Sequence, residues 1–511
     1  MKIKIAKKLA QSKRKIRKRL GKRSLPKDPR PMLNPGQIHY EMADRTRGIT
    51  CGGIGAVQML VQRLGLDQAI DRHLRIFKLH NPYFESDHVL NIAYNILCDG
   101  DCLEDLERLR NDENYLDAVG AERIPDPTTA GDFCRRFCSE QVEKLQDIIN
   151  ETRLKVWAQQ APAFFTEAVI DADGTIAPTT GECKEGMDIS YKGIWGYHPL
   201  VVSLSNTGEP LYLCNRSGNC TSSKDAAGYL DRAAELCLRA GFKKIRFRGD
   251  TDFSQTRYLD GWQKKGITFV FGINAMGNLV EIAENLPETA YTDLVRPSKY
   301  TVKTKPRRKP VNVKEQIVKE RGYKNLRLCS EQTAEFEYRP VKCRKSYRIV
   351  VLRKNLSVEK GEHALFDDIR YFFYITNDRK ASRTQIVRDA NHRCNQENLI
   401  SQLKTGVNAM KLPVDNLVSN WAYMVMACLA WNLKAWYALL LPVSGRWQDK
   451  HQRQKQTLLR MEFKKFRRFF VALPCQIVRT GRRLLYRLLG WNEYLDMFFR
   501  ALDSFCRPLR C

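Results

Sequence analysis

Alternating strand and helix patterns between residues 164 and 274 constrain the fold of this chain more than any other feature. The run "FFTEAVIDAD" is apolar and β-branched, as in a buried strand. Helical periodicity then appears over "SKDAAGYLDRAAELCLRAG" and stops at Gly241. Strands that alternate with a helix in this way predict an α/β fold, with a mixed sheet flanked by helices. The expected strands cover residues 164–173, the two arms of 197–218 around a turn at Asn206–Pro210, 243–250 and 266–274.

The segments on either side of this pattern have other textures. Residues 54–160 carry apolar residues at helical spacing, and residues 412–511 also look helical, with aromatic residues among many Arg and Lys. Residues 285–365 interrupt the α/β pattern with a basic stretch and strand-like pieces. We therefore expect a basic tail, disordered on its own, at 1–31; a helical region at 32–160; an α/β domain at 161–411 with a β-rich insertion at about 285–365; and a helical, basic region at 412–511.

The positive charge of this 511-residue chain is concentrated in three segments. Its 86 Lys and Arg outnumber 57 Asp and Glu, which gives a formal net charge of +29. Residues 1–30 carry a net charge of +13, residues 299–321 of +7 and residues 460–487 of +8, so the rest is close to neutral. Basic segments on a neutral body favour a polyanionic partner, first nucleic acid and second an anionic membrane surface. The basic residues expected to contact DNA from these segments include Lys13, Arg14, Arg17, Arg307, Arg308 and Lys309.

Composition argues against several other classes of protein. The 16 cysteines include no Cys-x-x-Cys pair, so we expect buried thiols, not a structural zinc site or a secreted disulfide scaffold. No apolar segment follows the basic N-terminus, so no secretory signal is expected. The most apolar stretch, Trp421–Trp431, has 11 residues, whereas a membrane-spanning helix needs roughly 20. These features predict a cytoplasmic protein that does not associate with a membrane.

Three carboxylates stand where strands and a helix can bring them to one edge of the sheet. Asp173 ends the first strand, in "VIDADGT", and Asp250 ends the strand "IRFRGD". Glu397 lies in a helix expected over about residues 382–404. Strand ends in an open α/β sheet face the crevice where ligands bind. Asp171 lies two residues before Asp173, on the same face of the strand, and is a possible further ligand.

Such a set of carboxylates suits divalent cations. Magnesium prefers oxygen ligands, and two ions about 4 Å apart can hold the attacking and leaving oxygens of a phosphoryl displacement. We expect two Mg²⁺ ions at this site, with Mn²⁺ as a substitute. Arg393 and Lys404 share a helical face with Glu397, since they stand four residues before it and seven after it. From that face they can contact DNA phosphates.

Each of these residues also has an ordinary explanation. Asp after a strand is a common turn residue or helix cap. Asp-x-Asp also occurs as a metal motif in glycosyltransferases. The helical face with Glu397 could be an exposed ion pair.

Taken together, the motifs "DADGT", "RGDTDF" and "RCNQENLISQLK" resemble those of DDE transposases from bacterial insertion sequences. The resemblance covers about residues 164–411 and is closest to the branch with a strand-rich insertion between the second Asp and the Glu. Arg393, Glu397 and Lys404 match the spacing of that branch's last motif, whereas its tyrosine position is Ala390 here.

The resemblance implies a ribonuclease-H-like fold for the domain at 161–411, with Asp173, Asp250 and Glu397 as catalytic metal ligands. It also implies a homodimer in the bacterial cytoplasm, associated with the nucleoid. Such an enzyme binds the terminal inverted repeats of its element, cuts DNA and joins the 3′-hydroxyl ends to target DNA. The repeats are expected to be recognised by the helical region at 32–160, either alone or together with the C-terminal region.

Two rival functions remain open on the sequence. One is a metal-dependent nuclease on the same fold, and the other is a DNA-binding protein with a decayed catalytic site. A membrane-surface protein, bound through residues 460–487, is a more distant third.

Overall fold

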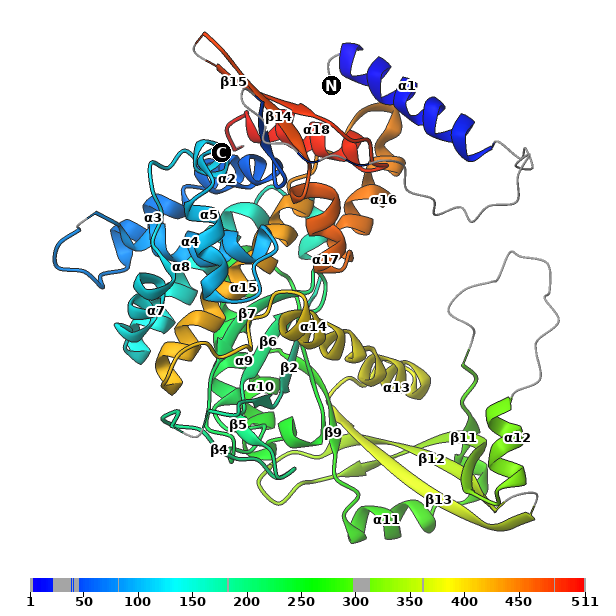
Figure 1. Cartoon of the computed structure of the whole chain (residues 1–511). Coiled ribbons are helices and arrows are strands. Elements are labelled where there is room, and N and C mark those ends of the chain that lie inside the picture. The colour runs from blue at the N-terminus through cyan, green and yellow to red at the C-terminus, as the bar shows by residue number, and fades with distance from the viewer. Residues whose placement is uncertain are drawn as a thin grey trace.

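A mixed sheet of nine strands runs through the middle of the molecule in this computed structural model (Figure 1). The structure describes residues 3–21, 38, 40, 46–296 and 313–509, apart from 81, 182, 361–362 and 482. In sheet order the strands are β10 (Thr292–Asp293), β11 (Lys324–Tyr338), β12 (Tyr347–Lys360), β13 (His363–Thr376), β9 (Thr268–Ile273), β8 (Ile245–Gly249), β2 (Ala168–Gly174), β6 (Leu200–Leu204) and β7 (Glu209–Cys214).

Five of these strands form the expected α/β core. β2, β6 and β7 are antiparallel, and β8 and β9 lie on the other side of β2, parallel to it. This order is that of a ribonuclease-H-like fold, so the predicted fold class is confirmed. Helix α9 (Ala226–Ala240) crosses from β7 to β8 and ends at Gly241, whose φ of +101° suits glycine. Helices α10 (Leu259–Lys264) and α11 (Gly277–Glu284) follow β8 and β9.

The insertion is built from β11, β12 and β13, as its β-branched and aromatic residues predict. It continues the central sheet, because the inner end of β13 pairs antiparallel with β9, from Phe373 opposite Ile273 to Thr376 opposite Val270. The long strands therefore project from the central sheet as a ribbon (Figure 1). Helix α12 (Val313–Glu320) precedes β11, and helices α13 (Arg383–His392) and α14 (Cys394–Thr405) lead the chain back onto the core.

The N-terminal and C-terminal helical regions pack against each other. Helix α15 (Leu417–Leu439) is buried along nearly all of its length and contacts helices from the N-terminal region. None of the helices in the described part of the chain is long and apolar enough to cross a membrane. The other helices here are α2 (Ile54–Leu64), α3 (Leu66–His73), α4 (Glu85–Leu97), α5 (Leu106–Arg110), α6 (Glu113–Val119), α7 (Pro127–Arg135), α8 (Ser139–Trp157), α16 (Gln448–Leu459), α17 (Phe463–Phe466) and α18 (Leu495–Phe505).

A buried polar cluster joins this helical body to the sheet. Glu209 on β7 is fully buried and accepts hydrogen bonds from Arg153 Nε at 3.1 Å and Trp157 Nε1 at 3.0 Å, both on α8. Trp436 Nε1 on α15 donates to the same carboxylate at 2.9 Å. The helical body and the catalytic sheet therefore share one core.

The C-terminal region contains a β-hairpin that the sequence analysis wrongly assigned to helix. Strands β14 (Cys475–Thr480) and β15 (Arg483–Leu488) pair with each other, and β14 also pairs with β1 (Arg47–Ile49). Pro474 disfavours continuation of the preceding helix. Gly481 adopts the left-handed φ of +53° in the tight turn between the strands. Alternate residues of β14 are buried, which is the periodicity of a strand.

The basic N-terminal segment is also more ordered than predicted. We expected residues 1–31 to be disordered on their own, but Ile3–Leu20 form helix α1, which lies beside α18. This stretch contains no Gly or Pro and many residues of high helix propensity. Leu9 packs against the hydrophobic core, although no residue of α1 is fully buried.

Candidate active site

Two parallel strands bring Asp173 and Asp250 together. In the register of β2 and β8, Asp171 lies opposite Arg248. Asp173 and Asp250 each follow two residues later, so the alternation of side chains places both on the same face, at the same edge of the sheet. Both side chains are half-buried. The edge predicted from the sequence is therefore formed by neighbouring strands.

Helix α14 carries Glu397 to this edge and is fixed there at two points. The side chain of Gln396 donates to the carbonyl oxygen of Val201 at 2.9 Å and also contacts Ser203 on β6. Val201 is the partner of Asp173 in the β2–β6 pairing. At the other end of the helix, Lys404 Nζ donates to the carbonyl oxygen of Ile176, just after β2, at 2.7 Å. The first turn of α14, with Glu397 exposed on it, is thereby held over the end of β2.

The charges of Asp250 and Glu397 both affect the pKa of Asp173, so the three carboxylates lie close enough to interact electrostatically. Burial raises the pKa of Asp173 to about 7, helped by the charges of Asp250 and Glu397, while Arg393 acts in the opposite direction. Burial also raises the pKa of Asp250, which Arg393 opposes and Glu397 reinforces. Arg393 stands between α13 and α14, and its Nη1 lies 3.8 Å from Asp250 Oδ2. Arg393 therefore lies close to the carboxylates of both Asp173 and Asp250.

The donor set fits divalent cations that prefer oxygen. Within the described ranges, no three His, Cys, Asp or Glu side chains lie close enough to bind one ion together. Repulsion between the acids contributes to the high pKa of Asp173, and a bound divalent cation would offset it.

Asp171 has a structural role instead of the ligand role that the sequence allowed. Its side chain is buried, and its two oxygens accept hydrogen bonds from Nε and Nη2 of Arg248, each at 2.7 Å. Arg248 also donates to Ser205 Oγ at 2.7 Å. Because both oxygens of Asp171 are occupied by a guanidinium, Asp173 is the member of the Asp-x-Asp pair that is better placed to bind a cation.

Sequence reasoning missed Arg248 and Gln396, which position the site. A signal for Arg248 was present, because Arg248-x-Asp250 on one strand repeats the spacing of Asp171-x-Asp173 on its parallel neighbour. Equal spacing on paired strands predicts two facing pairs. No comparable signal marks Gln396, since its partners lie about two hundred residues away in the chain.

The residues expected to contact DNA phosphates lie in different places. Arg393 and Lys404 flank the carboxylates, although the amine of Lys404 is half-buried and bound to a backbone carbonyl. Lys13, Arg14 and Arg17 are exposed on α1, which contacts α18 and lies away from β2 (Figure 1). Arg307, Arg308 and Lys309 lie outside the described residues.

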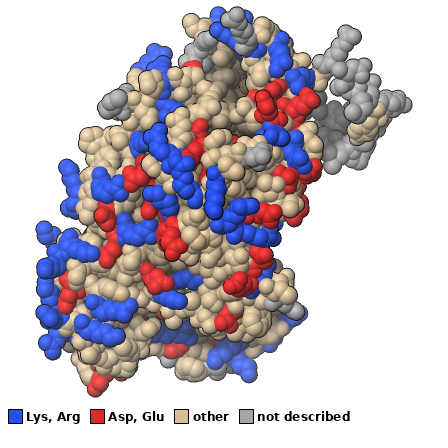
Figure 2. All heavy atoms as spheres, turned by 90° about the vertical axis from the view of Figure 1, so that its left-hand side faces the viewer, with Lys and Arg blue, Asp and Glu red and all other residues tan. Residues whose placement is uncertain are grey.

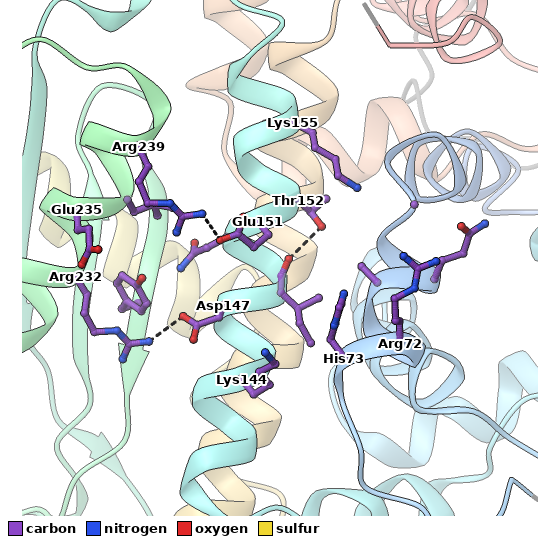
Figure 3. A pocket seen from close by; sticks show the side chains of 17 residues that line it. Arg72, His73, Lys144, Asp147, Glu151, Thr152, Lys155, Arg232, Glu235 and Arg239 are labelled. Atoms are coloured by element: carbon purple, nitrogen blue, oxygen red, sulfur yellow. Dashed lines mark hydrogen bonds and ion pairs between the residues drawn. The ribbon is translucent and has the colours of Figure 1, made fainter. Parts of the chain in front are cut away.

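A cavity of about 680 Å³ lies away from the carboxylates, between α3, α8 and α9. Two of its cations are paired: Arg232 and Arg239 on α9 form ion pairs with Asp147 and Glu151 on α8, at 2.9 and 2.6 Å (Figure 3). On the face at the left of Figure 1, basic and acidic side chains are interspersed (Figure 2). Among the described residues, acidic side chains therefore divide the positive charge on this face.

The family model for "Transposase DDE domain group 1" matches residues 48–507 of the chain. The ribonuclease-H-like sheet with its carboxylate edge and this match over most of the chain define the class: an enzyme of DNA strand cleavage and transfer. The chain belongs to the transposase DDE domain group 1 family and is a DDE transposase. DDE transposases generally use divalent metal ions.

Two further comparisons are weaker. No curated protein matches the chain. Among solved structures, piggyBac transposase, in a cryo-EM structure of its synaptic complex with hairpin DNA, is 11% identical with a TM-score of 0.36. That alignment covers 82% of each chain.

Proposed function

We propose that this transposase acts on the terminal inverted repeats of a bacterial insertion sequence, cuts DNA there and joins the 3′-hydroxyl ends to target DNA. The observation that carries the proposal is the convergence of Asp173, Asp250 and Glu397 at one edge of the sheet. Asp173 and Asp250 at the strand ends, together with Glu397 on α14, would bind two Mg²⁺ ions. Mn²⁺ would be able to replace Mg²⁺. Once bound, the ions supply activation of water and stabilise charge on the phosphate oxygens.

The reaction needs no covalent bond to the protein. Water attacks the phosphorus at the element end, and the bond from phosphorus to the 3′ oxygen breaks, which leaves a 3′-hydroxyl. That hydroxyl then attacks a phosphodiester of the target, whose own 3′ oxygen leaves. Arg393 would hold the scissile phosphate, and its position close to Asp250 supports this role. The test is incubation of the full-length protein with DNA that carries the element ends. We expect breaks at the ends with Mg²⁺ and none with a chelator, and intact ends under both conditions would refute the proposal.

Cleavage should increase with pH up to neutrality. A carboxylate binds a cation only after it loses its proton, and the pKa of Asp173 is raised to about 7. The cleavage rate is therefore expected to increase as the pH rises towards about 7 and to stay constant above that pH. Because metal binding competes with the proton, a higher Mg²⁺ concentration should move the midpoint to lower pH. Rate profiles at two Mg²⁺ concentrations measure this shift, and a midpoint independent of Mg²⁺ would contradict Asp173 as a ligand.

Helix α1 should supply part of the non-specific DNA affinity. Each phosphate contact contributes about 0.9 to the slope of log affinity against log salt. Replacing the exposed Lys13, Arg14 and Arg17 by Gln should therefore lower that slope by about 2 to 3, and deleting residues 1–30 should lower it further. The control replaces Arg14 and Arg17 by Lys, which keeps the charge and the slope. An unchanged slope in the deletion would rule out this role for α1.

We propose a homodimer that bridges two element ends in the bacterial cytoplasm, associated with the nucleoid. We assign recognition of the ends to residues 32–160. Sedimentation of the protein on paired-end DNA should show dimers, and monomers alone would contradict the bridge.

A further inference from the structure

A small hairpin beside the active site exposes an unusual set of apolar side chains. It comprises β4 (Asp188–Ile189) and β5 (Trp195–Tyr197), joined by a turn. Tyr191 is 77% exposed, Trp195 54%, Ile189 45% and Ile194 39%. Ile189 and Trp195 are direct partners in the register, so they share one face of the hairpin. Exposure of this much apolar surface on so few residues marks a binding element.

The hairpin is joined to the catalytic edge through its base. It lies in the connection from β2 to β6, the two strands that pair through Asp173 and Val201. Tyr197, at the end of β5, pairs with Ala177 of β3 (Ala177–Pro178). The preceding residue, Ile176, accepts the hydrogen bond from Lys404 on α14. Burial lowers the pKa of Lys404, the charge of Lys192 in the turn lowers it further, and the charge of Asp173 raises it. Lys192 and Asp173 therefore both lie near the Lys404 amine.

Its base is rigid, whereas its tip is free to meet a ligand. Tyr197 is fully buried, and its hydroxyl donates to the carbonyl oxygen of Glu185 at 2.7 Å. Glu185 in turn donates its N–H to the carbonyl oxygen of Asp415 at 2.8 Å, which ties the hairpin to the segment before α15. In the tip, Gly193 has a φ of +71° and closes a tight turn. The hairpin therefore combines an anchored base with exposed aromatic side chains at its tip.

The chemistry of the tip favours nucleic acid. The Lys192 amine lies 5.4 Å from the centre of the Tyr191 ring. A cation that can contact a phosphate is therefore next to an aromatic ring on which a base can stack. Aromatic rings bind unpaired bases of any sequence by stacking, and an adjacent cation attracts the backbone. If the protein acts as proposed above, the DNA strands next to the cleavage site are the part of the DNA closest to this tip.

We propose that the β4–β5 hairpin binds unstacked DNA bases next to the scissile phosphate, with Trp195 and Tyr191 as the stacking surfaces and Lys192 as a phosphate contact. This inference rests on the proposed function, because it places the DNA at the carboxylate edge. It adds a site for single-stranded DNA, built from residues outside the three motifs.

Binding can be tested without cleavage and without the element's sequence. The probes are a labelled short duplex and the same duplex with a single-stranded oligothymidine tail, and the full-length protein is kept in Ca²⁺. The wild type should prefer the tailed duplex by about tenfold, as expected for stacking of one or two bases. The double variant Tyr191→Ala, Trp195→Ala should lose this preference, and Trp195→Phe should keep most of it.

Trp447→Ala is the matched control, since Trp447 is 55% exposed and also lies next to cations, Arg446 and Lys450. We expect it to retain the preference for the tail. The proposal is overturned if the double variant binds the tailed duplex as the wild type does, or if it changes only the oligomeric state, which would indicate an interface between copies. Cleavage by a wild type that shows no preference for the tail would overturn this proposal alone, whereas a wild type that binds neither DNA nor metal would overturn the proposed function.

Discussion

Replacing Asp173 by Asn is expected to slow strand cleavage by about 10³-fold or more, because a metal site contributes several kcal/mol to the transition state. Asp250→Asn and Glu397→Gln should have effects of the same order. Affinity for DNA should change little, since we propose that the basic segments outside this edge supply most of the phosphate contacts. Single-turnover cleavage and filter binding measure the two quantities separately.

The matched control is Asp252→Asn. Asp252 is exposed and lies two residues after Asp250, so its replacement removes one nearby negative charge without removing a carboxylate of the set. We expect its cleavage rate to stay within about tenfold of the wild type, about 1.4 kcal/mol in the barrier. Equal losses in Asp252→Asn and Asp173→Asn would mean that cleavage depends on total charge and not on ligand geometry.

Stability gives an independent check on Asp173→Asn. The pKa of Asp173 in the folded protein is raised to about 7 from an ordinary 3.8. Its contribution to stability is therefore fully present below about pH 4 and is lost as the pH rises through about 7. Above pH 7 the metal-free Asn variant should melt at or above the temperature of the wild type. A loss of cleavage together with a lower Tm would indicate misfolding, not a missing ligand.

The second large effect is expected from Arg248→Met, which leaves the buried carboxylate of Asp171 without its partner. Removing one member of a buried ion pair costs about 3–5 kcal/mol. The double variant Asp171→Asn, Arg248→Met should recover part of this loss, because it leaves no buried charge. Denaturant unfolding of the two single variants and the double variant measures the coupling between the residues.

An exposed ion pair provides the comparison. Arg239 and Glu151 are 2.6 Å apart, but both side chains are about half exposed. Arg239→Met should therefore cost no more than about 1 kcal/mol.

The double variant Asp171→Asn, Arg248→Met should also retain cleavage in proportion to its folded fraction. Complete loss of cleavage in that folded variant would restore Asp171 as a candidate metal ligand.

The strands and the three carboxylates were predictable because their signals are local. Strand alternation and the apolar runs place Asp173 and Asp250 at strand ends, and helical periodicity places Glu397 on a helix. The role of Asp171 was not predictable in the same way. It depends on which residue of β8 lies opposite it, and two acids on one face look equivalent until that register is known.

In the two terminal regions, the sequence patterns led to the wrong conformation. The run around β14 and β15 mixes Arg with apolar residues and fits a helical as well as a strand period, so Pro474 and Gly481 were the better guides. In α1, high net charge suggested disorder, but uninterrupted helix propensity and a contact with the core outweigh it.

The most direct test of the central claim is strand transfer of pre-cut DNA. Element ends that already carry a free 3′-hydroxyl are incubated with the full-length protein, Mg²⁺ and a supercoiled plasmid. The account predicts plasmid molecules covalently joined to the ends, and it predicts their absence with Asp173→Asn. Efficient nicking of the plasmid by the wild-type protein without any joined product would contradict it and would identify a metal-dependent nuclease instead.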